Sequence, residues 1–110
     1  MSDEVLVGID AGGTTTRTLV TTLDGEVLGV GHRGGGNPEH TEMTAAKRNV
    51  QGAVTEALAA SDREHGDVAA LTAGLAGLDD ESDEAWAAEF LAIDGLGCDP
   101  VAVHDAVVAH

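Results

Sequence analysis

The chain has 110 residues, with 20 Asp plus Glu against 5 Lys plus Arg and a formal net charge of −15 at pH 7. A chain of this length buries about two-thirds of its unfolded surface, which predicts one domain over residues 1–110, and with only 2% aromatic residues its core must consist of Val, Leu, Ile and Ala. The charge excludes the basic surface that nucleic acids and anionic membranes require.

The first third of the chain predicts three consecutive antiparallel strands. Residues 5–10 form a short apolar run that ends in a carboxylate, which is typical of a buried strand. Residues 14–23 are rich in Thr, Val and Leu, and residues 26–32 predict the third strand. Between the last two, Asp24-Gly25 predicts a hairpin with a two-residue loop, because Gly tolerates a positive φ.

A helix is predicted after a glycine-rich segment. Residues 34–38 read Gly-Gly-Gly-Asn-Pro, which predicts a flexible loop. From about residue 41 to residue 60, apolar side chains recur every three or four residues, as on one face of a helix. The side chains expected on that buried face are Met43, Ala46, Val50, Ala53 or Val54, and Ala57.

A fourth strand is predicted over residues 67–75, with a loop from Gly74 to Gly77 at its carboxyl end. The acidic run at residues 79–83 favours a helix N-terminus, where negative charge is stabilised.

Trp86, Phe90 and Ile93 follow at helical spacing, and Gly95 is the expected stop. Residues 101–103 predict a fifth strand, parallel because a helix precedes it. The order of elements predicts an α/β fold, with helices packed on a mixed five-stranded sheet.

The most informative segment joins the first two strands. Gly12 and Gly13 allow a tight turn in which successive N–H groups can face a phosphate, and the Thr14 and Thr15 hydroxyls add donors. Asp10 can bind hydrated Mg²⁺. A Walker-type phosphate loop is excluded, because a strand follows and no Lys stands at its required position. An ordinary Gly-Gly hairpin explains the same residues equally well.

Two further residues are candidates for a site. Asp105 follows a short apolar strand, where α/β sheets place ligand-binding groups, and it could act as a general base or cap a helix. Asn37 offers a donor and an acceptor to a sugar hydroxyl, or serves as a turn residue before Pro38. The five His residues lack the spacing of metal ligands.

The remaining features concern the environment of the protein. Acidic residues are spread from Asp3 to Asp105, as in proteins adapted to high salt. Cys98 is the one cysteine, so a disulfide within the chain is excluded. The acidic N-terminus lacks the basic start and apolar run of a signal peptide. These features predict a cytoplasmic protein.

Five segments in order resemble the N-terminal lobe of the N-acetylglucosamine kinases and the related BadF/BadG/BcrA/BcrD-type ATPases, of the actin-like, sugar-kinase and Hsp70 superfamily. The resemblance covers essentially the whole chain and implies a ribonuclease H-like (actin-like ATPase) lobe. The segments are Ile9 to Arg17, Asp24-Gly25, Gly36-Asn37-Pro38, Gly74 to Asp79, and Val103 to Ala106.

The resemblance also implies roles for individual residues in an ATP-dependent sugar kinase. It implies that ATP is bound by the first phosphate loop, that Mg²⁺ lies near Asp10, that N-acetylglucosamine or a related amino sugar is the acceptor, and that Asp105 is the general base. The ATP-binding residues are Asp10, Gly12, Gly13, Thr14 and Thr15, and the sugar-binding residues are Asn37, Ala76, Gly77 and Asp105.

Two alternatives stay open at this point. Kinases of this type have a second, C-terminal lobe, which these 110 residues do not include. An ATPase activator of a CoA-linked dehydratase or reductase is one alternative, although such activators bridge an iron–sulfur cluster and this chain has a single Cys. The other is an isolated lobe that acts as an assembly module, for which a homodimer is expected because its unpaired interface exposes apolar surface.

Overall fold

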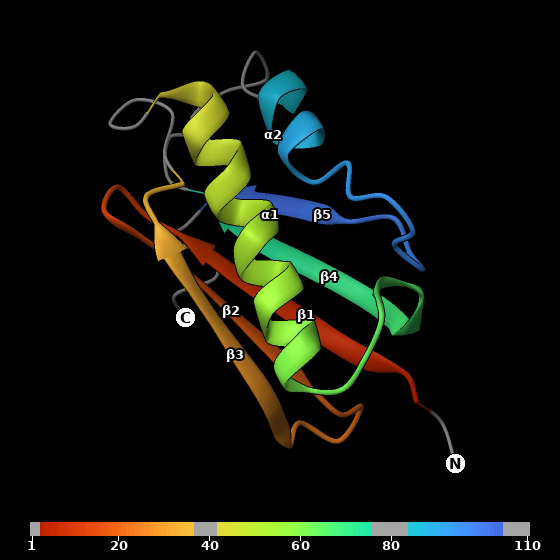
Figure 1. Cartoon of the computed structure of the whole chain (residues 1–110). Coiled ribbons are helices and arrows are strands. Elements are labelled where there is room, and N and C mark those ends of the chain that lie inside the picture. The colour runs from red at the N-terminus through yellow and green to blue at the C-terminus, as the bar shows by residue number, and fades with distance from the viewer. Residues whose placement is uncertain (1–2, 37–41, 76–83, 105–110) are drawn as a thin grey trace.

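Five strands form one mixed sheet in the computed structural model, which describes residues 3–36, 42–75 and 84–104 (Figure 1). The strands are β1 (Val5–Ala11), β2 (Thr15–Thr21), β3 (Val27–Gly34), β4 (Val68–Leu75) and β5 (Val101–His104). They lie in the order β3-β2-β1-β4-β5. The pairs β1–β2 and β2–β3 are antiparallel, and the pairs β1–β4 and β4–β5 are parallel. The predicted sheet, with three antiparallel strands first, is confirmed.

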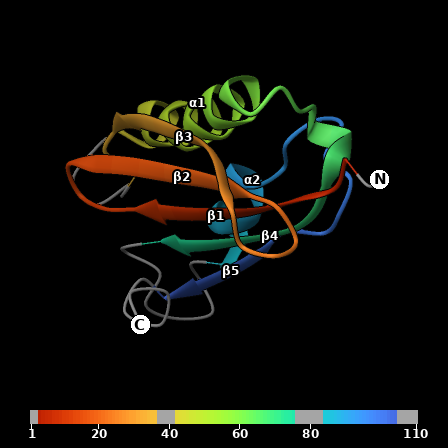
Figure 2. The same ribbon diagram turned by 90° about the horizontal axis from the view of Figure 1, so that it is seen from below.

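The helices lie against one face of this sheet. The long helix α1 (Met43–Ala60) connects β3 at one edge with β4 beyond β1, and it packs mainly on β3 and β2 (Figures 1 and 2). A short 3-10 helix, η1 (His65–Asp67), precedes β4, and α2 (Glu84–Phe90) precedes β5. Among the described residues, no helix combines the length and the apolar character that crossing a bilayer requires.

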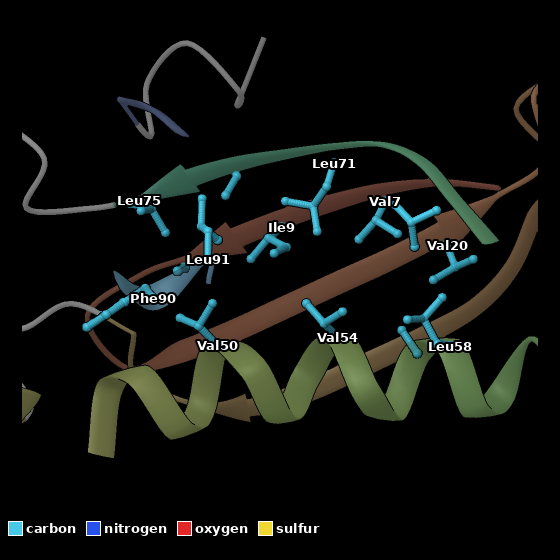
Figure 3. Packing of buried hydrophobic residues seen from close by; sticks show 14 of the residues in the cluster. Val7, Ile9, Val20, Val50, Val54, Leu58, Leu71, Leu75, Phe90 and Leu91 are labelled. Atoms are coloured by element: carbon cyan, nitrogen blue, oxygen red, sulfur yellow. The ribbon is translucent and has the colours of Figure 1, made fainter. Parts of the chain in front are cut away.

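The core lies between α1 and the sheet. Along β1, Val5, Val7 and Ile9 are buried while Gly8 and Asp10 are exposed, as expected for alternating residues of a strand covered on one face. The Val50, Val54 and Leu58 side chains of α1 point toward the strands, as Figure 3 shows. Full burial of each such side chain stabilises the fold by about 1.5–3 kcal/mol. As predicted, Val, Leu, Ile and Ala make up most of this core.

Three details of the helices differ from the prediction. The Met43 side chain is 44% exposed rather than buried, because it begins α1 at the margin of the sheet. The second helix ends at Phe90, so Ile93 packs against the core from the segment after the helix. Both Ala53 and Val54 are buried.

The aromatic pair is only partly in the core. Phe90 is fully buried, whereas Trp86 is half-buried and packs edge-on against it, with ring centroids 4.9 Å apart. Phe90 and Leu91 reach the same apolar layer as Val50 (Figure 3).

The contact between α1 and β3 depends on glycines. Gly29 and Gly31 of β3 are buried beneath the helix. A Cβ on Gly31 would overlap the carbonyl group of Ala53, and a Cβ on Gly29 would lie 2.5 Å from the carbonyl oxygen of Ala57. The backbones of α1 and β3 therefore approach more closely than side chains at these positions would permit.

The hairpin between β2 and β3 has a longer loop than predicted. Thr22 N–H donates to the Glu26 carbonyl at 2.9 Å, and Gly25 N–H donates to the Thr22 carbonyl at 3.0 Å. Three residues, not two, therefore lie between the paired positions. Gly25 has a φ of 95°, the left-handed conformation that closes a three-residue hairpin loop. The conformation expected of Gly25 is confirmed, and the loop length was wrong.

Candidate functional site

The loop between β1 and β2 is a two-residue turn. Gly12 N–H donates to the Thr15 carbonyl at 2.8 Å, which places Gly13 and Thr14 at the tip. The next register pair is Ala11 with Thr16. The hairpin therefore brings together all five residues that were expected to bind ATP, since Asp10 lies one register pair further along.

Two backbone N–H groups at this turn have no acceptor in the described part of the chain. They belong to Gly13 and Thr14, which lie outside the strand ladders and whose nitrogens donate to no other described residue. The Thr14 side chain is exposed, and Gly13 is half-buried. Successive N–H groups in a tight turn form a concavity that binds anions. The turn at residues 12–15 thus has donors suited to a phosphate, and we call it the phosphate-binding loop for this predicted role.

Asp10 and Arg17 lie next to each other beside this loop. They are register partners on β1 and β2, and both are exposed on the sheet face opposite α1. The position of Arg17 beside Asp10 was not predicted from the sequence. A hairpin with a two-residue turn at Gly13-Thr14 places Asp10 opposite Arg17, so the length of the turn was sufficient to predict this pair. An acidic and a basic residue therefore lie next to the phosphate-binding loop.

The parallel strands β1, β4 and β5 end at the same edge of the sheet, and the β1–β2 loop lies at this edge. Ala11 of β1 pairs with Leu75 of β4, and Leu75 pairs with His104 of β5. Gly74 pairs with Asp10 and belongs to β4, so it is not part of the predicted Gly74–Gly77 loop. Ligands of open α/β sheets bind outside the carboxyl ends of the strands, which is where the phosphate-binding loop lies.

Four predicted site residues fall outside the described residues. These are Asn37, Ala76, Gly77 and Asp105. Their assigned roles therefore stay predictions.

The segment that follows β3 is held against the phosphate-binding loop. Gly36 N–H donates to the Gly12 carbonyl at 3.0 Å, and the Asn49 side-chain amide of α1 donates to the Gly35 carbonyl at 2.9 Å. Both glycines are buried. The prediction of a flexible loop is therefore wrong for residues 34–36, because Gly34 belongs to β3 and hydrogen bonds to other elements hold Gly35 and Gly36. Nothing in the sequence marks Asn49, which is a polar residue beside the buried face of its helix.

The donor set beside the loop fits magnesium. Within the described ranges, no three His, Cys, Asp or Glu side chains gather closely enough to hold a metal ion. Asp10 offers a single exposed carboxylate next to the phosphate-binding loop. Mg²⁺ typically binds one or two carboxylates together with substrate phosphates and several waters, so one carboxylate at this place is sufficient.

A second polar cluster lies at the β3 edge of the sheet, on the α1 side. The Glu56 carboxylate accepts a hydrogen bond from the His32 backbone N–H at 2.8 Å and from the Arg33 guanidinium at 2.5 Å. The backbone hydrogen bond and the positive charge of Arg33 together hold the pKa of Glu56 below its ordinary value. The carboxylate occupies a donor of the edge strand that would otherwise be open to another chain.

The family of the chain follows from its sequence as a whole. The model of the BadF/BadG/BcrA/BcrD ATPase family matches residues 7–104, a range that includes the phosphate-binding loop and β5. The chain belongs to this family. The comparison with curated proteins found no match.

Two solved structures resemble this BadF/BadG/BcrA/BcrD-family chain. A putative N-acetylglucosamine kinase from Chromobacterium violaceum is 20% identical, with a TM-score of 0.62, and the match covers 92% of this chain and 34% of the kinase. Component A of (R)-2-hydroxyglutaryl-CoA dehydratase from Acidaminococcus fermentans is 19% identical, with a TM-score of 0.52, covering 76% of this chain and 28% of that one.

These likenesses establish the fold. The chain has the ribonuclease H-like fold of actin-like ATPases and sugar kinases, as predicted. It spans about a third of the length of the kinase that it resembles.

Proposed function

We propose that this chain is the phosphate-binding lobe of an ATP-dependent sugar kinase, with N-acetylglucosamine or a related amino sugar as the acceptor. The observation that carries the proposal is the pair of N–H groups at Gly13 and Thr14, which have no acceptor in the described part of the chain and lie beside Asp10. The family match and the likeness to a kinase fold support it.

In this proposal the loop binds phosphate without a Lys. The Gly13 and Thr14 N–H groups and the Thr14 and Thr15 hydroxyls donate to phosphate oxygens, and Arg17 adds a positive charge. Asp10 would hold Mg²⁺, which neutralises phosphate charge when bound. A chain with a net charge of −15 can thereby accept a triphosphate, because backbone dipoles and one guanidinium balance its charge locally.

The proposed reaction is transfer of the γ-phosphoryl group of ATP to a sugar hydroxyl. Asp105 accepts the hydroxyl proton, the hydroxyl oxygen forms a bond to the γ-phosphorus, and the bond from that phosphorus to the bridging oxygen breaks to release ADP. Asn37, Ala76 and Gly77 contact the sugar. A general base of this kind contributes about 10²–10⁴ in rate.

The proposed kinase needs a second lobe. The chain spans 34% of the similar kinase, and phosphoryl transfer requires groups that surround the nucleotide. We therefore propose that ATP turnover also requires residues other than these 110.

The full-length protein tests this function directly. ADP release is measured with N-acetylglucosamine, with other amino sugars and with no acceptor, in dilute buffer and in molar KCl because of the high net charge. Asp105→Asn should abolish phosphorylation and leave Mg·ATP binding intact. Asp99→Asn, which makes the same charge change at an exposed loop position, should leave both unchanged. Equal activity of Asp105→Asn and the parent protein would remove the proposed base.

An activator of a CoA-linked dehydratase is the second candidate. It is favoured by the likeness to component A of (R)-2-hydroxyglutaryl-CoA dehydratase. Cys98, the one cysteine of the chain, is half-buried and packs against the core, so a cluster would need cysteines from elsewhere. Iron bound to anaerobically purified full-length protein, together with ATP hydrolysis that no sugar accelerates, would favour this activator over the kinase.

A further inference from the structure

Residues 34–36, which we call the glycine connection, lie between α1 and the phosphate-binding loop. The connection leaves the end of β3 and is bonded on both sides. On one side, the Asn49 amide donates to the Gly35 carbonyl at 2.9 Å. On the other, Gly36 N–H donates to the Gly12 carbonyl at 3.0 Å. A continuous series of hydrogen bonds therefore joins the middle of α1 to the loop.

The residues around Gly36 pack so closely that the glycine connection cannot shift without moving them. A Cβ on Gly36 would lie 2.8 Å from Ala11 Cβ, 2.8 Å from Thr16 Oγ1 and 2.9 Å from Val50 Cγ2. These three residues are fully buried, and they belong to β1, β2 and α1. Because a close-packed interior transmits displacement rather than absorbing it, a shift of the connection would move the loop as well.

The bond to Gly12 sets the direction of the next N–H group. In a trans peptide group, the C=O and the N–H point in opposite directions, and no described peptide bond is cis. The Gly12 carbonyl points at Gly36 N–H. The N–H of Gly13, which shares that peptide group, must therefore point away from the glycine connection. This is one of the two N–H groups without an acceptor in the described part of the chain.

We propose that Asn49 is a positioning residue for phosphate binding. Through Gly35 and Gly36 it holds the Gly12–Gly13 peptide group in the orientation that presents Gly13 N–H to the nucleotide. Asn49 itself does not contact the ligand. The proposal rests on the proposed function for its ligand, and on the contacts within the chain for its mechanism.

The matched control is Gln51, on the same helix. Its side-chain amide donates to the Phe90 carbonyl at 3.0 Å, and it is half-buried, as Asn49 is. Asn49→Asp and Gln51→Glu each exchange an amide donor for a carboxylate of equal size. Both should cost similar stability, but only Asn49 is connected to the phosphate-binding loop. Asn49→Ala removes the donor without adding charge.

The experiment measures the affinity of full-length protein for Mg·ATP by calorimetry. Asn49→Asp and Asn49→Ala should bind about tenfold more weakly than the parent, the effect of one hydrogen bond of ordinary strength. Gln51→Glu should bind as the parent does. Unchanged affinity in both Asn49 variants, or an equal loss in Gln51→Glu, would overturn the proposal.

A second measurement on ligand-free protein separates this proposal from the proposed function. Amide hydrogen exchange at Gly36 should be faster in both Asn49 variants, by about tenfold, and unchanged in Gln51→Glu. If the parent does not bind Mg·ATP, the phosphate-binding function fails. The exchange rates then decide whether Asn49 holds the loop, and an unchanged Gly36 rate would contradict that.

Discussion

Two glycine-rich regions of this chain use the same residue for opposite reasons. In β3, Gly29 and Gly31 lie beneath α1, where a Cβ on Gly31 would overlap the Ala53 carbonyl. In the phosphate-binding loop, a Cβ on Gly12 would meet only the Thr15 carbonyl oxygen at 3.5 Å, an ordinary contact. The β3 glycines are required by packing within the chain, whereas no described residue requires a glycine at position 12.

The difference shows where a functional reason is needed. A glycine that its own fold requires is explained by that fold. A glycine with room for a side chain, beside N–H groups that have no acceptor in the described part of the chain, leaves space that the proposed ligand would occupy. Glycine-to-alanine substitutions in β3 and in the phosphate-binding loop test this difference.

The largest effect is expected at Gly31. In Gly31→Ala the new methyl group must displace the α1 backbone, which should lower the free energy of unfolding by about 3 kcal/mol, the upper part of the range for overpacked cores. Urea denaturation measures it. The control is Gly8→Ala on β1, where a Cβ would lie within 4 Å of no described atom, and which should raise stability by about 0.5 kcal/mol. Equal stability of the two variants would show that α1 does not contact β3 as described.

Thr18, the register partner of Gly31, should respond with the opposite sign. Its hydroxyl is fully buried and has no hydrogen-bond partner among the described residues. Thr18→Val replaces that hydroxyl by a methyl group and should raise the free energy of unfolding by about 1 kcal/mol. In Thr21→Val, by contrast, a hydroxyl that donates to the Thr22 carbonyl is lost, so stability should fall. A loss in Thr18→Val would mean that its hydroxyl has a partner.

The same contrast explains what the sequence could predict of the fold. Local patterns were sufficient for the five strands, for the antiparallel arrangement of the first three and for α1, because alternation and helical spacing report burial within one element. The β3 glycines were assigned no role, because they are required by the carbonyl groups of Ala53 and Ala57, which belong to a different element. The end of α2 at Phe90 was missed for a related reason. Ile93 is apolar at helical spacing, yet it reaches the core from outside the helix.

The part of the candidate site whose residues lie close together in the sequence could be predicted. A hairpin of two adjacent strands brings Asp10 to the loop at Gly12 and Gly13, so the chain sequence determines their proximity. Asn49 was not predictable, because it reaches the glycine connection from 14 residues away. Arg17 is an intermediate case, because its position could have been predicted from the sequence but was not. Its position beside Asp10 follows from hairpin register, which the loop length alone specifies.

The contact of α1 with β3 also has a polar component that acid should remove. Glu56 is ionised in the folded chain, with its pKa below the ordinary value because of the His32 backbone hydrogen bond and the charge of Arg33. A lowered folded-state pKa contributes stability above the unfolded-state pKa, near 4.5, and loses it as pH falls through the folded value. Glu56→Gln should therefore be less stable than the parent at pH 7, and the difference should shrink below pH 4.5.

The matched control for that experiment is Glu89→Gln. The Glu89 carboxylate of α2 lies 3.3 Å from the Lys47 amine of α1, and both side chains are exposed. An exposed ion pair of this kind contributes little, so the stability change at pH 7 should stay within about 0.5 kcal/mol. A pH-independent gap between Glu56→Gln and the parent would contradict the role given to the carboxylate.

The smallest effect on stability is expected at Gly12, and it sharpens the comparison most. Gly12→Ala introduces an ordinary contact with Thr15 and no left-handed backbone, so the free energy of unfolding should stay within about 0.5 kcal/mol of the parent value. The affinity of the full-length protein for Mg·ATP should nevertheless fall, because the loop backbone has to approach the phosphates closely. If Gly12→Ala kept both the stability and the Mg·ATP affinity of the parent, neither the fold nor ligand binding would explain the glycine at this position.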